Sequence, residues 1–136
     1  MNEATREAVT AWVKKAESDW EMVTILSSHE SCPRDAVYSR CQQHVEKLLK
    51  ALLTLHGIEA PRTHNLRRLV QMTKTVSKEL PRLEDSSDIL TIHGVASTYP
   101  DDWREITADE MFEVIKVARE FLSVLLPELQ IPDKSD

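Results

Sequence analysis

The strongest constraint on the fold is the spacing of apolar residues in and just before SRCQQHVEKLLKALLTLHG, residues 39–57. Apolar side chains recur there at steps of three and four residues, which places them on one face of an α-helix. Pro33 suits the first turn of this helix, and Gly57 favours the left-handed conformation that ends one. The stripe consists of Val37, Cys41, Val45, Leu48, Leu52 and Leu55.

Three further segments have the same periodicity. One runs from about Ala4 to Ser28. Another starts after Thr63, whose hydroxyl is suited to cap it, and is closed by Pro81. The last begins with a capping box at residues 107–110 (TADE) and continues to Pro127. Their stripes are Val9, Trp12, Ala16, Trp20, Val23 and Leu26; Leu66, Leu69, Val70, Val76 and Leu80; and Met111, Ile115, Ala118, Leu122 and Leu125.

The predicted fold is all-α. We expect an up-and-down antiparallel bundle of four main helices plus a short fifth helix around Ile89. Only two Gly and six Pro occur in 136 residues, which is too little turn material for an all-β fold. The length is that of one domain, 1–136, with a core of about 4–127 and a polar tail, 128–136.

Several features bear on the compartment. No apolar run approaches the roughly 18 residues of a membrane span, and the N-terminus MNEATREAV lacks signal-peptide character. Cys32 and Cys41 have no metal-binding spacing, and we expect both to be free thiols in a reducing environment. We therefore expect a cytoplasmic protein with no membrane contact, no metal site and no cofactor.

The charge is unevenly distributed. The net charge is −6, yet residues 40–82 hold nine Lys and Arg against three Glu, a balance of +6. A basic middle between acidic flanks is able to form one electropositive face. The simpler interpretation is that these cations take the solvated outer positions of two helices. The cations are Arg40, Lys47, Lys50, Arg62, Arg67, Arg68, Lys74, Lys78 and Arg82.

Four motifs occur in a fixed order along the chain. They are Trp12 with Ala16 and Asp19, then QQHVEKLLKALL (42–53), GIEAPRTHNLRRL (57–69) and YPDD (99–102). From about Val13 to Phe121 the sequence resembles the HEPN domain family (higher eukaryotes and prokaryotes nucleotide-binding). The resemblance implies a helical bundle, commonly a homodimer. It also implies a minimal nucleotidyltransferase as a partner, in a toxin–antitoxin-like or defence system.

Many members of that family are thought to cut RNA without a metal through an R-x(4–6)-H motif. Here the histidine comes too early, because Arg40 and His44 form R-x3-H and Arg62 and His64 form R-x-H. Arg40 and His44 would still be neighbours on one helix face. Arg40, His44 and His64 are therefore the candidate catalytic residues, although we expect no catalysis. A partly exposed helix histidine is the simpler interpretation of His44.

The candidate ligand-binding residues are Lys47, Lys50, His64 and Tyr99. The two lysines and His64 would face a phosphate, and Tyr99 would stack on a base. Structural roles are open for each residue. Glu46 and Lys50 have the spacing of a helix ion pair, His64 is placed to bond a helix start, and a Tyr before a Pro can anchor a loop.

Three hypotheses follow. The leading one is a nucleotide- or RNA-associated interaction domain of the HEPN type without catalysis of its own. The second is a metal-independent RNase that uses a shifted Arg/His pair. The third is a plain assembly module whose bundle docks another protein through an exposed apolar patch.

Overall fold

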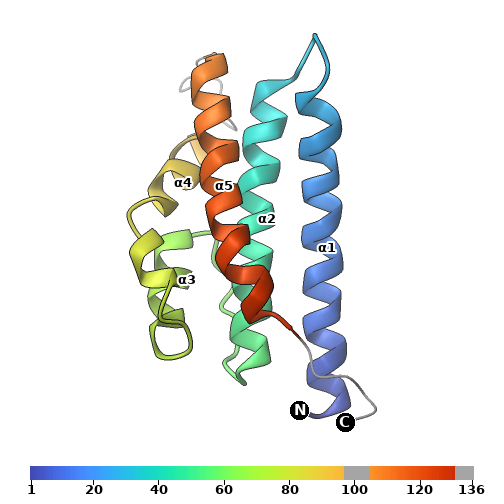
Figure 1. Cartoon of the computed structure of the whole chain (residues 1–136), viewed down its shortest axis with the longest axis vertical. Coiled ribbons are helices and arrows are strands. Elements are labelled where there is room, and N and C mark those ends of the chain that lie inside the picture. Colours follow the sequence, from blue (N-terminus) through green and yellow to red (C-terminus); the bar gives the residue numbers. More distant parts are fainter. Residues whose placement is uncertain (97–104, 131–136) are drawn as a thin grey trace.

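The structure is a computed structural model that describes residues 1–96 and 105–130, with the side chains of 92–96 left out. All regular structure within those ranges is helical, which confirms the predicted all-α bundle (Figure 1). The α-helices are α1 (Glu3–Ser27), α2 (Arg34–Leu55), α3 (Leu66–Met72), α4 (Ser87–Ala96) and α5 (Ala108–Glu128). Two 3-10 turns, η1 (Thr73–Thr75) and η2 (Leu80–Leu83), lie between α3 and α4.

The long helices α1, α2 and α5 lie side by side, with α2 in the middle (Figure 1). The chain runs up α1, down α2, up through α3, the two turns and α4, and down α5. Residues on every side of α2 are buried, because α1, α5 and the α3–α4 limb each pack against it. Within the described ranges, no helix is long and apolar enough to cross a membrane.

The third limb differs from the prediction of one helix that begins after Thr63 and closes at Pro81. The N-cap of α3 is Asn65, whose side chain accepts the Arg68 N–H at 3.2 Å, whereas the Thr63 hydroxyl accepts the Asn65 N–H at 3.1 Å. The α-helix ends at Met72, and Pro81 lies inside η2 instead of closing a helix. The third limb is therefore a chain of short helical pieces.

The composition after Met72 explains this break. Thr73, Thr75 and Val76 are β-branched, and such residues lose side-chain freedom in a helix. The Thr73 hydroxyl also donates to the Val70 carbonyl at 2.6 Å, and the Ser77 hydroxyl accepts the Leu80 N–H at 3.1 Å. These local bonds compete with the helical ladder.

The predicted C-terminus of α2 and the predicted N-terminus of α5 are confirmed. Gly57 has φ +73°, and the N–H groups of Gly57 and Ile58 bond to the carbonyls of Thr54 and Leu53 at 3.1 and 2.9 Å. This is the hydrogen-bond pattern of a Schellman C-terminus. Thr107 and Glu110 form both bonds of the capping box, each at 3.1 Å. The short helix expected around Ile89 is α4.

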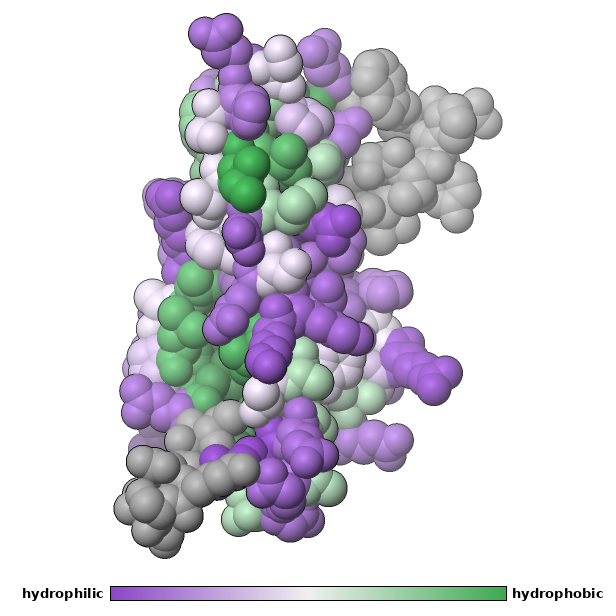
Figure 2. Space-filling model, turned by 90° about the vertical axis from the view of Figure 1, so that its right-hand side faces the viewer, coloured by the Kyte–Doolittle hydropathy of each residue, from purple (hydrophilic) through white to green (hydrophobic). Residues whose placement is uncertain are grey.

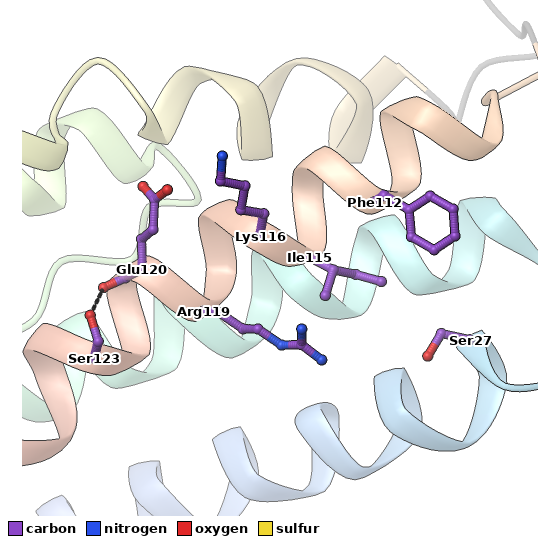
Figure 3. Close-up of a pocket in the computed structure, with 7 residues that line it drawn as sticks. All are labelled: Ser27, Phe112, Ile115, Lys116, Arg119, Glu120 and Ser123. Atoms are coloured by element: carbon purple, nitrogen blue, oxygen red, sulfur yellow. Dashed lines mark hydrogen bonds between the residues drawn. The ribbon is translucent and has the colours of Figure 1, made fainter.

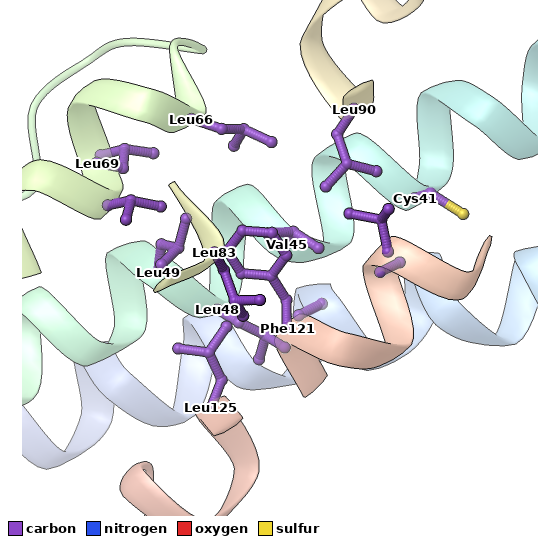
Figure 4. Close-up of a cluster of buried hydrophobic side chains, with 14 of the residues drawn as sticks. Cys41, Val45, Leu48, Leu49, Leu66, Leu69, Leu83, Leu90, Phe121 and Leu125 are labelled. Carbon is purple, nitrogen blue, oxygen red and sulfur yellow. The ribbon is translucent and has the colours of Figure 1, made fainter. Parts of the chain in front are cut away.

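The core joins α2 to all of its neighbours (Figure 4). Cys41, Val45, Leu48 and Leu49 of α2 meet side chains of α3, α4 and α5, and Phe121 fills the centre with no exposed surface. Burial raises the pKa of the Cys41 thiol to about 12, although the positive charge of Arg119 acts in the opposite direction. Cys32 and Cys41 are both free thiols.

Candidate polar clusters and groove

Two buried carboxylates organise the polar residues at the α1–α2 interface. Asp19 of α1 is 2% exposed and Glu46 of α2 is 5% exposed. A charged carboxylate that is taken out of water needs ion-pair and hydrogen-bond partners, because burial alone strongly disfavours the ionised form. The side chains that pair with Asp19 and Glu46 lie within residues 40–64, which include the candidate residues of the sequence analysis except Tyr99.

The first set is the Asp19 cluster, which consists of Asp19, Arg40 and Lys47. Arg40 Nη1 lies 2.9 Å from one Asp19 oxygen and Lys47 Nζ lies 2.6 Å from the other. Arg40 and Lys47 are seven residues apart on α2 and therefore share a helix face. The cluster joins α1 to α2. Because Arg40 and Lys47 both pair with Asp19, their charges are already balanced in part by a carboxylate.

The second set is the Glu46 cluster, which consists of Glu46, Gln42, Lys50 and His64. Glu46 accepts from Lys50 Nζ at 3.1 Å, Gln42 Nε2 at 2.9 Å and His64 Nδ1 at 2.8 Å. The expected helix ion pair between Glu46 and Lys50 is thus present, with the Lys50 side chain 8% exposed. Lys50 Nζ also lies 5.6 Å from the centre of the Trp12 ring, within cation–π range.

His44 is buried, at 3% exposure, so the interpretation as a partly exposed helix histidine is wrong. Its Nδ1 lies 2.6 Å from the Ala16 carbonyl oxygen, which only accepts, so Nδ1 carries the proton. The ring stacks on Trp20 with 4.9 Å between centroids. Burial lowers the pKa of His44, partly offset by the Ala16 hydrogen bond and by Asp19. Among the described residues, its Nε2 has no hydrogen-bond partner.

Four of the six candidate residues lie in the two clusters. Arg40 and Lys47 belong to the Asp19 cluster, whereas Lys50 and His64 belong to the Glu46 cluster. The His64 side chain is 80% exposed, in contrast to His44. Tyr99, the base-stacking candidate, lies outside the described residues.

The basic segment 40–82 is largely neutralised within the fold. Arg67 bonds to Glu84, Asp85 and Asp88 at 2.7–3.2 Å, and its hydrogen bonds lower the pKa of Asp88. Six of the nine cations have a carboxylate partner: Arg40, Lys47, Lys50, Arg67, Lys74 and Arg82. Several of the acids lie outside residues 40–82, so the local excess of positive charge in the sequence is not an excess in space.

A groove that the sequence reasoning missed lies between the C-terminal end of α1 and residues 112–123 of α5 (Figure 3). It has a volume of about 590 Å³. It is lined by Ser27, Phe112, Ile115, Lys116, Arg119, Glu120 and Ser123. The signal was present in the sequence, because Phe112, Ile115, Arg119 and Ser123 follow one another at steps of three, four and four residues along one face of α5.

The structure therefore defines an all-α bundle with buried ion-pair clusters between its first two helices. A model of the HEPN domain matches residues 9–129, and the chain belongs to the HEPN family. Membership of this family supports a nucleotide- or RNA-related function. Searches for curated relatives and for similar solved structures gave no significant match. The described residues contain no group of three or more His, Cys, Asp and Glu that could hold a metal ion.

Proposed function

We propose that this chain is a nucleotide- or RNA-associated interaction domain of the HEPN type that has no catalysis of its own. The observation that carries the proposal is the state of His44, the histidine nearest to the R-x(4–6)-H spacing. Its ring is buried against Trp20 and its Nδ1 is bonded to Ala16. A general acid or base has to reach the proton that it moves, directly or through one water molecule. His44 serves instead to join α1 to α2.

The proposed ligand is a nucleotide or a short RNA, in keeping with the family. Lys47, Lys50 and His64, together with Tyr99, remain candidate contacts. A phosphate at the first three would compete with Asp19 or Glu46, which already hold them. Since both carboxylates are buried, loss of their partners would be costly. Binding at this position would therefore couple to loosening of the α1–α2 interface.

The proposed assembly is a homodimer that works with a minimal nucleotidyltransferase in a toxin–antitoxin-like system. Figure 2 looks at α1 and shows apolar areas between polar side chains. Exposed large apolar residues of the described part include Met22 and Ile25 on α1 and Phe112 and Leu126 on α5. Such residues supply the apolar contacts of protein interfaces. Light scattering tests the dimer: a monomer mass at all concentrations would contradict it.

Two measurements on the purified chain test the proposal together. Calorimetric titration with nucleotides and a short single-stranded RNA should give saturable binding. Incubation of a mixed RNA pool with a high concentration of protein and a chelator should leave the RNA intact. No binding of either ligand up to millimolar concentration contradicts the ligand part, and metal-independent cleavage contradicts the non-catalytic part.

One observation favours an RNase as the second candidate function. His64 is exposed, and its Nδ1 donates to the buried carboxylate of Glu46, so that in the neutral ring Nε2 is the acceptor. A histidine oriented by a carboxylate is a common arrangement for general-base catalysis. If the chain cuts RNA, His64→Ala should abolish cleavage. His56→Ala, which removes another exposed histidine at the end of α2, should leave it unchanged.

A further inference from the structure

The groove between α1 and α5 combines groups of three chemical kinds. Phe112 and Ile115 supply apolar surface, Arg119 and Lys116 supply positive charge, and Ser27 and Ser123 supply hydroxyl groups. In Figure 3 the side chains of Phe112, Ile115 and Arg119 lie on the side of α5 that faces α1. Lys116 and Glu120 point to the opposite edge of the helix. The interior of the groove is therefore formed by an aromatic ring, an aliphatic side chain and a guanidinium group.

The cations of the groove differ from those of the basic segment. Both Lys116 and Arg119 are exposed. Within the ranges that the structure describes, neither forms an ion pair with a carboxylate. The positive charge of Arg119 also acts on the buried Cys41 thiol, where it partly opposes the rise in pKa that burial causes. A guanidinium group with unused N–H donors is well suited to bind a phosphate.

The Phe112 ring is 61% exposed. The other Phe, Trp and Tyr side chains of the described residues are buried or half-buried. It precedes Arg119 by seven residues, so their Cα atoms are about 10 Å apart along the helix axis. The Arg119 side chain bends toward the Phe112 end of the groove (Figure 3). An exposed ring and a nearby unpaired cation form the basic arrangement of a stacking platform for single-stranded nucleic acid.

The side of the bundle bordered by α1 and α5 differs between its two ends. The other end holds a second groove, of about 420 Å³, lined by Thr10, Val13, Lys14, Glu17, Leu126, Leu129 and Gln130. Its lining contains no aromatic ring, and its one Lys is matched by one Glu. The groove at Phe112 has two cations against one carboxylate, as well as the ring. Charge and aromatic character thus favour an anionic, aromatic ligand at that end alone.

We propose that the Phe112 groove binds a nucleobase that carries a phosphate, either as a free nucleotide or as one unit of a single-stranded RNA. This proposal rests on the nucleotide- or RNA-associated function and names a site for it. Phe112 stacks on the base, Ile115 forms the apolar floor and Arg119 binds the phosphate. Lys116 adds to the positive potential at the edge. The volume of about 590 Å³ is within the range of small-molecule sites.

The proposal predicts the effects of three substitutions. Phe112→Leu keeps an apolar side chain but removes the stacking face, and should weaken binding about fivefold or more. Arg119→Gln removes a charged hydrogen-bond donor and should weaken it about tenfold or more. Lys78→Gln is the matched control, because Lys78 is an exposed cation on the segment between η1 and η2, and its removal should leave the affinity unchanged.

Amide chemical-shift mapping by NMR locates the site. The probes are adenosine monophosphate, a single-stranded hexaribonucleotide and inorganic phosphate. Shifts of Ser27 and of residues 112–123 with the hexaribonucleotide support the proposal. Matching shifts with adenosine monophosphate assign a free nucleotide as a ligand as well. Phosphate alone should move residues near Arg119 and leave those near Phe112 in place.

Three outcomes overturn the groove assignment. Shifts centred on Lys47 and His64 move the ligand to the polar clusters and leave the proposed function intact. Groove signals that respond to protein concentration, and not to ligand, make the groove an interface between two copies of the chain. Absence of shifts with all three probes up to millimolar concentration removes both the groove and the ligand part of the proposed function.

Discussion

Removal of the Glu46 carboxylate should expose how much the fold depends on the buried polar clusters. Glu46→Leu replaces the carboxylate with an apolar side chain of similar size and leaves the Lys50 ammonium, 8% exposed, without its carboxylate. It also removes the acceptor for Gln42 and His64. Loss of one member of a buried ion pair costs about 3–5 kcal/mol, because the other charge stays buried and uncompensated.

The structure places the expected cost near the lower end of that range. Lys50 keeps the Trp12 ring at 5.6 Å, and its flexible stem allows the ammonium to move toward water. We therefore expect Glu46→Leu to lower the free energy of unfolding by about 3 kcal/mol, or the Tm by about 10 °C for a domain of this size. The double variant Glu46→Leu/Lys50→Met, which removes both charges, should lose only about 1 kcal/mol.

Urea unfolding followed by circular dichroism measures both quantities in one double-mutant cycle, which also includes Lys50→Met alone. The matched control is Glu79→Leu, because Glu79 pairs with Arg82 at the surface, where the side chains are 65% and 58% exposed. That pair should contribute less than about 0.5 kcal/mol. A cost of Glu46→Leu no larger than that of Glu79→Leu would contradict a stabilising role of the buried Glu46 carboxylate. A double variant less stable than either single variant would do the same.

Three further predictions concern single residues. Burial lowers the pKa of His44, so as the pH falls the unfolded chain binds a proton at this residue before the folded chain does. The free energy of unfolding should therefore fall as the pH drops below 6.5, and His44→Leu should show a smaller fall in urea titrations across this range. Gly57→Ala should lower the free energy of unfolding by about 1 kcal/mol at constant pH, because the φ of +73° is strained for a residue with a Cβ atom. No neighbouring atom would clash with that Cβ, and Gly57→Asn should cost less. A thiol reagent at pH 8 should leave Cys41, with its pKa of about 12, unmodified in the native protein, while urea should release it; modification of two thiols per native chain would contradict the burial of Cys41.

Much of the fold was predictable because α1, α2 and α5 carry regular apolar stripes and conventional end signals. The Gly57 C-terminus and the Thr107 capping box are local features whose geometry the sequence determines almost alone. The third limb was mispredicted because Val76 and Leu80 continue the helical spacing, and no Gly or Pro interrupts residues 64–80. The break at Thr73 depends on weaker signals, namely β-branched residues and local hydroxyl bonds.

The polar clusters were less predictable, since they depend on which charged side chains lie next to one another in the folded protein. Residues 40–82 have a positive balance in the sequence, yet Asp19 lies on α1 and Glu84 follows η2. His44 sits at the edge of the apolar stripe, and its burial follows from the position of Trp20 on the neighbouring helix. Pairings of this kind require the packing of α1 on α2, which periodicity within one helix does not specify.

The central claim is that this HEPN chain binds RNA or nucleotide without cutting it. Fluorescence anisotropy of a labelled single-stranded RNA, measured over a series of salt concentrations with chelator present, tests it most directly when the same samples are run on a denaturing gel. We predict saturable binding with a log–log salt slope of about −1.4 for two phosphate contacts, and intact RNA throughout. Unchanged anisotropy at every salt concentration, or RNA fragments that disappear with His64→Ala, would contradict it.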